Sequence, residues 1–122
     1  MIRYEELAEL LEERFPRLSE RFAECAYVRE LNHCYYGDIL NPYIKELLKS
    51  DITNEVAIKK VFGFYEKLAS NGDEKTVELL QVTLLEYLWD EKIVYERALM
   101  YMQPKTREVN EKISDYLNIP KK

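Results

Sequence analysis

Apolar residues recur at every third or fourth position along most of the chain, which is the spacing of one face of an α-helix. Tyr4, Leu7 and Leu11 show this spacing in the first segment, where glutamates fill the opposite side. No segment has the apolar–polar alternation of a half-buried β-strand. The pattern therefore predicts an all-α protein with about seven helices. We expect them at about residues 3–14, 17–31, 39–49, 54–70, 74–89, 91–102 and 106–117.

Residues that favour turns and helix caps separate the first helices. Pro16 lacks a backbone N–H and is expected to end the first one. Gly37 is predicted to form a turn, and Asp38 is a good N-terminal cap for the helix that follows. Pro42 would then lie in the first turn of that helix, where a missing N–H costs little.

The breaks in the second half of the chain are short. Residues 50–54 are rich in capping side chains, Gly72 is predicted to close one helix, and Asp73 is predicted to cap the next. Helices joined so tightly resemble a HEAT-like stack of helical hairpins, with a closed orthogonal bundle as the alternative. The chain has no clean internal repeat to select between them. Its length of 122 residues indicates a single helical domain, residues 1–122.

Composition narrows the class of protein. Hydrophobic residues make up 47% of the chain and only three residues are Gly and four Pro, which excludes disordered, collagen-like and turn-rich all-β chains. No apolar run is long enough to span a membrane, and the acidic start of the chain lacks the apolar stretch of a signal peptide. Cys25 and Cys34 are too few for a disulfide framework. We therefore expect a cytoplasmic protein.

The chain carries a formal net charge of −5, from 18 basic and 23 acidic residues. Because phosphate contacts require clustered Lys and Arg, direct binding to nucleic acid is not expected. An acidic surface is better suited to a basic protein partner.

Reactive side chains are scarce. His33 is the only histidine, and Glu30-x-x-His33 places a carboxylate and an imidazole one helical turn apart, as in di-iron bundles. Such bundles use that pair twice, and no second histidine is present. The sequence contains no phosphate-binding glycine loop and no nucleophile motif. We therefore expect neither catalysis nor a metal or other cofactor.

Two groups of residues are candidates for contact with a partner. Tyr35 and Tyr36 either pack a corner between helices or provide the amphipathic contact area typical of binding sites. The second group surrounds the only Trp, in a stretch from residue 73 to residue 91 that has six acidic residues and one Lys. This stretch is either a solvated acidic edge or a patch that meets a basic surface. Its candidate contact residues are Glu86, Trp89, Asp90 and Glu91.

Two strings of residues resemble a known family. They are Tyr36-Gly37-Asp38-Ile39-Leu40-Asn41-Pro42-Tyr43 followed by Glu46-Leu47-Leu48, and Leu84-Leu85-Glu86-Tyr87-Leu88-Trp89-Asp90 followed by Ala98, Tyr101-Met102 and Pro104-Lys105-Thr106. With them, the chain from about Phe15 onward resembles a family of small, all-helical bacterial proteins of largely unassigned biochemistry. Some of these look like immunity proteins encoded beside contact-dependent or other polymorphic toxins.

The resemblance implies an immunity protein that binds the toxic domain of a cognate antibacterial toxin and blocks its active or target-binding surface. If that toxin is a nuclease, its cleft is basic and an acidic immunity protein matches it electrostatically. Two other functions stay open. One is a HEAT-like adaptor for protein partners unrelated to toxins, and the other is an enzyme or metalloprotein that uses Glu30 and His33.

Overall fold

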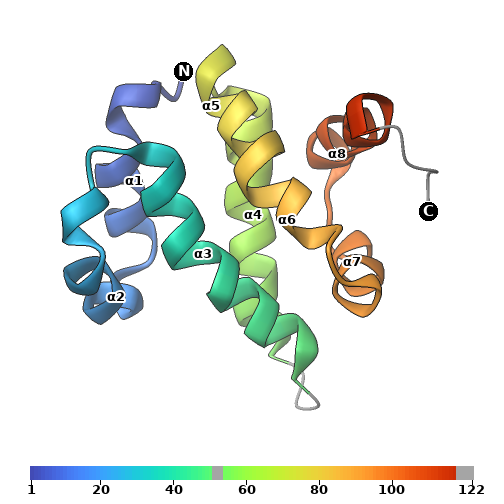
Figure 1. The fold of residues 1–122 in the computed structure, drawn as a ribbon, viewed down its shortest axis with the longest axis horizontal. Helices are drawn as coiled ribbons and strands as arrows, with labels where there is room; N and C mark the ends of the chain where they lie inside the picture. Colours follow the sequence, from blue (N-terminus) through green and yellow to red (C-terminus); the bar gives the residue numbers. More distant parts are fainter. Residues whose placement is uncertain (51–53, 118–122) are drawn as a thin grey trace.

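The computed structural model describes residues 1–50 and 54–117, which fold into helices joined by short turns (Figure 1). The helices are α1 (Leu7–Arg14), α2 (Ser19–Glu24), α3 (Asn32–Lys49), α4 (Glu55–Asn71), α5 (Glu74–Leu79), α6 (Glu86–Leu88), α7 (Lys92–Leu99) and α8 (Pro104–Leu117). Single 3-10 turns lie at Tyr4–Glu6, Pro16–Leu18 and Ala26–Val28. A π-helical segment, Leu80–Leu85, joins α5 to α6, so the described residues form seven separate α-helices. The prediction of an all-α protein with about seven helices is confirmed.

The helices predicted for the second half of the chain match α4, α5–α6, α7 and α8 to within a few residues. Asp73 caps α5 as predicted, since its Oδ1 accepts a hydrogen bond from the Thr76 N–H at 2.9 Å. Gly72 closes α4 with an extended backbone, and a Cβ there would lie 2.4 Å from the Leu68 carbonyl oxygen. Glycine is therefore required at this turn for space. Residues 51–53 of the predicted break at 50–54 lie outside the described residues.

The predicted second helix and the turn after it are wrong. Residues 17–31 contain only α2 and two single 3-10 turns, and no residue of α2 is buried. Helix α3 begins at Asn32 and continues through Gly37 and Asp38, which the sequence places in a turn. Pro42 lies inside this helix, beyond its first turn.

Packing explains why α3 continues through a glycine. The apolar face of α3 keeps its helical spacing on both sides of Gly37, and its buried hydrophobic residues are Tyr35, Tyr36, Ile39, Leu40, Ile44 and Leu48. Gly37 also lets α3 approach the π-helical segment, because a Cβ at this position would lie 3.2 Å from Thr83 Cγ2. One turn later, Asn41 Nδ2 donates to the Thr83 carbonyl oxygen at 3.0 Å. The free energy gained by burying the apolar face thus exceeds the cost of a glycine inside a helix, which is about 1 kcal/mol relative to alanine.

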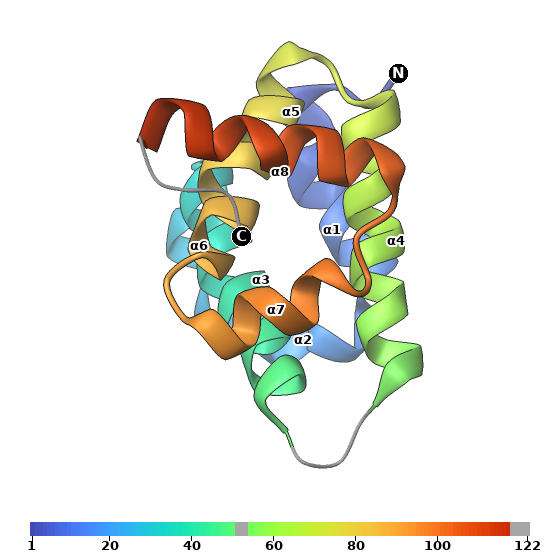
Figure 2. The same ribbon diagram turned by 90° about the vertical axis from the view of Figure 1, so that its right-hand side faces the viewer.

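The helices form three layers (Figure 1). Helices α3, α4 and α5–α6 make the middle layer, α1 and α2 lie on one side of it, and α7 and α8 lie on the other. Helix α8 runs across α4 and across the π-helical segment, as Figure 2 shows. Crossing helices of this kind are the arrangement expected of an orthogonal bundle, the alternative to a HEAT-like stack.

One cluster of buried side chains runs through the three layers, from Leu7 in α1 to Ile113 in α8. Aromatic rings pack against one another within this cluster. Phe15 lies edge-on to Phe64 at a centroid distance of 5.4 Å, and Phe62 lies edge-on to Tyr65 at 5.3 Å. In the part of the chain that the structure describes, none of the helices has both the length and the apolar character needed to cross a bilayer.

A carboxylate of α4 caps the start of α8. Glu66 accepts hydrogen bonds from the backbone N–H of Lys105 at 3.1 Å and from that of Thr106 at 2.9 Å. The Thr106 hydroxyl donates to the same carboxylate at 2.9 Å. The first turn of α8 is thus completed by a side chain that lies about 40 residues earlier in the chain.

The N-terminal segment pairs with the turn between α4 and α5. The Ile2 N–H donates to the Asn71 carbonyl oxygen at 2.7 Å, and the Asp73 N–H donates to the Ile2 carbonyl oxygen at 2.9 Å. Asp73 Oδ2 in turn accepts from the Tyr4 N–H at 2.9 Å. The chain terminus is thereby fixed beside residues from its middle (Figure 1).

Candidate functional site

Tyr35 and Tyr36, two of the predicted partner-binding residues, lie in the core, with exposed fractions of 1% and 0%. The Tyr36 hydroxyl donates to the Leu7 carbonyl oxygen at 2.6 Å, and its ring stacks on Phe64 at a centroid distance of 6.2 Å. The Tyr35 hydroxyl donates to Glu12 Oε2 at 2.6 Å. These contacts correct the prediction, because rings buried in this way offer no surface to a partner.

Glu12 links Tyr35 to an ion pair at the edge of the core. Arg29 Nε and Nη2 donate to the two oxygens of the Glu12 carboxylate at 2.8 and 2.9 Å. The hydrogen bonds from Arg29, with a smaller contribution from Tyr35, hold the pKa of Glu12 below its usual value. This arrangement ties the turn before α3 to α1.

Trp89, at the end of α6, is half-buried. Its Nε1 donates to Asn110 Oδ1 at 2.9 Å, and its ring lies against Tyr95 at a centroid distance of 4.4 Å. Asn110 Nδ2 donates to the Tyr95 hydroxyl at 2.8 Å. Trp89 therefore joins α6 to α7 and α8, and only part of its ring is available to a partner.

The three predicted acidic residues near Trp89 have different surroundings. Glu86 is half-buried, whereas Asp90 is exposed. Glu91 pairs with Lys45 Nζ at 2.5 Å and with Lys49 Nζ at 3.0 Å, and the Lys45 hydrogen bond contributes most to lowering the pKa of Glu91. Two lysines of α3 thus neutralise the charge of Glu91. Asp90 is the most exposed of the three predicted acidic residues.

The widest hollow near these residues is an open groove beside α3, with a volume of about 540 Å³. We call it the α3 groove. It is lined by Glu24, Cys25, Tyr27, Gly37, Asp38, Asn41, Pro42 and Tyr87. A small hollow that shares Tyr87 with the groove is lined also by Lys45, Asp90, Glu91 and Val94. The predicted acidic end of α6 thus continues the α3 groove.

The groove is acidic. The carboxylates of Glu24 and Asp38 line it, and neither forms a hydrogen bond or an ion pair with another described residue. Burial and the charges of Asp38 and Glu24 raise the pKa of the Cys25 thiol, while Arg21 acts in the opposite direction. Both carboxylates therefore impose a negative potential on the same part of the groove.

Sequence reasoning missed Glu24, Tyr27, Asp38 and Tyr87. The first two fall within a predicted regular helix and Asp38 at a predicted cap, so the sequence predicts no common face for their side chains. Tyr87 lay between two predicted residues, Glu86 and Trp89. The string from residue 36 to residue 43 was the available signal, because it contributes half of the residues that line the groove.

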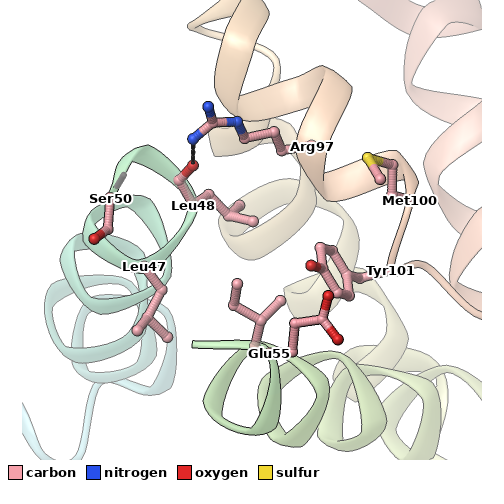
Figure 3. Close-up of a pocket in the computed structure, with 8 residues that line it drawn as sticks. Leu47, Leu48, Ser50, Glu55, Arg97, Met100 and Tyr101 are labelled. Atoms are coloured by element: carbon pink, nitrogen blue, oxygen red, sulfur yellow. Dashed lines mark hydrogen bonds between the residues drawn. The ribbon is translucent and has the colours of Figure 1, made fainter. Parts of the chain in front are cut away.

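A second pocket, of about 310 Å³, lies between the end of α3, the start of α4 and the end of α7 (Figure 3). Its walls combine apolar side chains, such as Leu47 and Ile58, with polar groups, and Arg97 and Glu55 are its charged residues. An Arg97 nitrogen donates to the Leu48 carbonyl oxygen. None of the predicted partner-binding residues lines this pocket.

Glu30 and His33, the pair considered for metal binding, lie in different elements. Glu30 lies in an exposed turn, whereas His33 is in the first turn of α3 with its Nδ1 directed to Thr83 Oγ1. Within residues 1–50 and 54–117, no three His, Cys, Asp or Glu side chains are grouped so as to hold a metal ion. Cys25 and Cys34 are both free thiols, the first half-buried and the second exposed.

Comparison with known proteins gives a family without an assigned activity. A family model described as "Domain of unknown function (DUF7674)" matches residues 8–118. No curated protein and no solved structure matches the chain.

Proposed function

The chain belongs to the DUF7674 family, and from its surface we propose that it acts as an immunity protein, which binds the toxic domain of a cognate antibacterial toxin and blocks that domain's active or target-binding surface. The observation that carries the proposal is the α3 groove. It combines two carboxylates that have no ion-pair partner among the described residues with the rings of Tyr27 and Tyr87. Partly exposed aromatic rings are enriched at surfaces that bind proteins, and charged groups beside them determine which partner is attracted.

Charge indicates the kind of surface that the groove would bind. The net charge of the chain is −5, and the groove continues into the acidic end of α6 at Asp90. A basic cleft, such as that of a nuclease, complements this surface, and long-range attraction would speed association. A toxin domain of the nuclease class is therefore the partner that we propose.

The proposal is for binding without catalysis. The histidine is held against Thr83, and the thiol in the groove, Cys25, has a pKa above its usual value, which disfavours the reactive thiolate. These features support a role in covering another macromolecule.

The direct experiment combines the purified chain with the toxin domain encoded beside its gene. We expect a stable complex by size-exclusion chromatography and calorimetry, and rescue of growth when both are expressed in a sensitive cell. Association should slow as salt is added, because screening weakens electrostatic steering. A toxin domain that neither forms a complex nor is neutralised would contradict the proposal.

A pair of variants tests the place of binding. Pro42→Trp puts a large side chain into the α3 groove from an exposed position, and Lys67→Trp makes a comparable change on the exposed face of α4. We expect Pro42→Trp to lose complex formation and rescue, and Lys67→Trp to keep both. The HEAT-like adaptor is the alternative function, but the crossing of α8 over α4 does not favour the stack on which it rests.

A further inference from the structure

The negative charges of the α3 groove come from two elements that are separate in the chain. Glu24 is the last residue of α2, whereas Asp38 lies in the second turn of α3. Both are exposed, and both act on the Cys25 thiol between them. A cation in the groove would therefore meet two carboxylates that have no competing ion pair with another described residue.

Hydrogen-bond acceptors without partners lie along the same stretch of α3. Asn41 lines the groove with an exposed fraction of only 9%, and its Oδ1 has no hydrogen-bond partner among the described residues. Pro42 has no N–H, so the Asp38 carbonyl lacks the donor that it would normally have four residues later. The wall of the groove thus contains a buried amide oxygen without a partner, within one helical turn of Asp38.

Aromatic rings complete the groove. Tyr27 is 81% exposed, and Tyr87 lines both the groove and the small hollow beside it. A planar cation can stack on such rings while its edge donates to carboxylates.

From these features we propose that the α3 groove recognises an arginine side chain of the partner protein, an inference that rests on the proposed function. A guanidinium has five N–H donors in one plane, which suits two carboxylates, and its faces suit tyrosine rings. A lysine ammonium is a compact and strongly hydrated charge that uses fewer of these groups.

The test is a titration with the blocked peptide Ac-Gly-Arg-Gly-NH2, followed by the amide signals of ¹⁵N-labelled protein. The chain has three glycines, of which Gly37 lines the groove and Gly63 and Gly72 do not. We expect a saturable shift of the Gly37 signal, with a dissociation constant of roughly 1 mM, while Gly63 and Gly72 stay in place. The two distant glycines also report that the protein remains folded.

Matched peptides and variants test whether the groove recognises both the charge and the planar shape of a guanidinium. The citrulline peptide, which keeps the shape of arginine but has no charge, should not bind, and the lysine peptide should bind several-fold more weakly. The double variant Glu24→Gln, Asp38→Asn should bind the arginine peptide at least about tenfold more weakly. Tyr27→Ala, which removes an exposed ring, should weaken binding several-fold.

The inference is overturned if Gly37 does not shift, if the citrulline or lysine peptide binds as tightly as the arginine peptide, or if the double variant binds unchanged. Failure of the inference can be told apart from failure of the proposed function. A toxin domain that is still bound and neutralised by the double variant would leave the immunity role intact and remove the arginine site. If the chain binds the arginine peptide but forms no complex with the toxin domain, the arginine site stands and the immunity role fails.

Discussion

Two buried tyrosines provide a matched test of the core. Tyr36 and Tyr65 are both 0% exposed, but their hydroxyl groups differ. The Tyr36 hydroxyl donates to the Leu7 carbonyl oxygen at 2.6 Å, whereas the Tyr65 hydroxyl has no hydrogen-bond partner among the described residues. Substitution by Phe removes one oxygen from each ring and leaves the packing almost unchanged, so the two variants separate the value of the hydrogen bond from the cost of burial.

The two substitutions should have opposite effects on the free energy of unfolding. Tyr36→Phe loses one buried hydrogen bond and should lower this free energy by about 1 kcal/mol. Tyr65→Phe removes a hydroxyl that was buried without a partner, and should raise it by about 1 kcal/mol. The variants should therefore differ by about 2 kcal/mol.

Urea unfolding measures this difference, with Trp89 fluorescence and helical circular dichroism as independent probes. For a slope of about 2 kcal/mol per M, the two midpoints should lie roughly 1 M apart. Tyr27→Phe is the control, because Tyr27 is 81% exposed and its hydroxyl should contribute less than about 0.5 kcal/mol.

The reasoning is refuted if Tyr65→Phe destabilises the protein as much as Tyr36→Phe does. That result would mean that the Tyr65 hydroxyl has a partner in solution, such as a bound water molecule. A difference in the unfolding slope between the variants would be a separate finding, because it would show a change in the surface exposed on unfolding.

Three further changes test particular contacts. Glu66→Ala should lower the free energy of unfolding by about 2 kcal/mol, because it removes the cap of α8, whereas Glu96→Ala on the exposed face of α7 should have little effect in the same urea assay. Gly72→Ala should cost more than about 2 kcal/mol in thermal unfolding, because its Cβ would lie 2.4 Å from the Leu68 carbonyl oxygen; an unchanged midpoint would contradict this. The pKa of Glu12 is lower in the folded state than in the unfolded chain, so the stability that it adds relative to Glu12→Gln should be present above about pH 4.3 and disappear as the pH falls through the folded pKa. A difference between the two proteins that persists at pH 2 would contradict that assignment.

Periodicity predicted the helices of the second half of the chain because each of them buries one continuous stripe and is bounded by a local signal. Asp73 is such a signal, since its cap is formed within three residues. Gly37 misled the prediction because its role depends on Thr83, a residue of another helix, and no local pattern reports that contact. The extent of α3 is therefore a tertiary property.

The candidate site was less predictable than the fold for the same reason. Tyr35 and Tyr36 have the residue type of a binding surface, but the continuation of α3 turns them into the core. Once α3 is extended, Asp38 faces the groove that α2 closes on its other side. Because the start of α3 is predicted at residue 39 and not at Asn32, the sequence assigns Tyr35 and Tyr36 to the surface, whereas Asp38 is the residue that lines the groove.

The pairing of Ile2 with the turn between α4 and α5 bears on where a shortened form of this chain should begin. The family match begins at residue 8, after the paired segment. A fragment started there would lose both main-chain bonds to Ile2 and the bond from Tyr4 to Asp73, and would leave the amide of Asp73 without its acceptor. The matched range therefore leaves out main-chain hydrogen bonds that complete the turn between α4 and α5, and a fragment of this chain should retain the residues that precede the match.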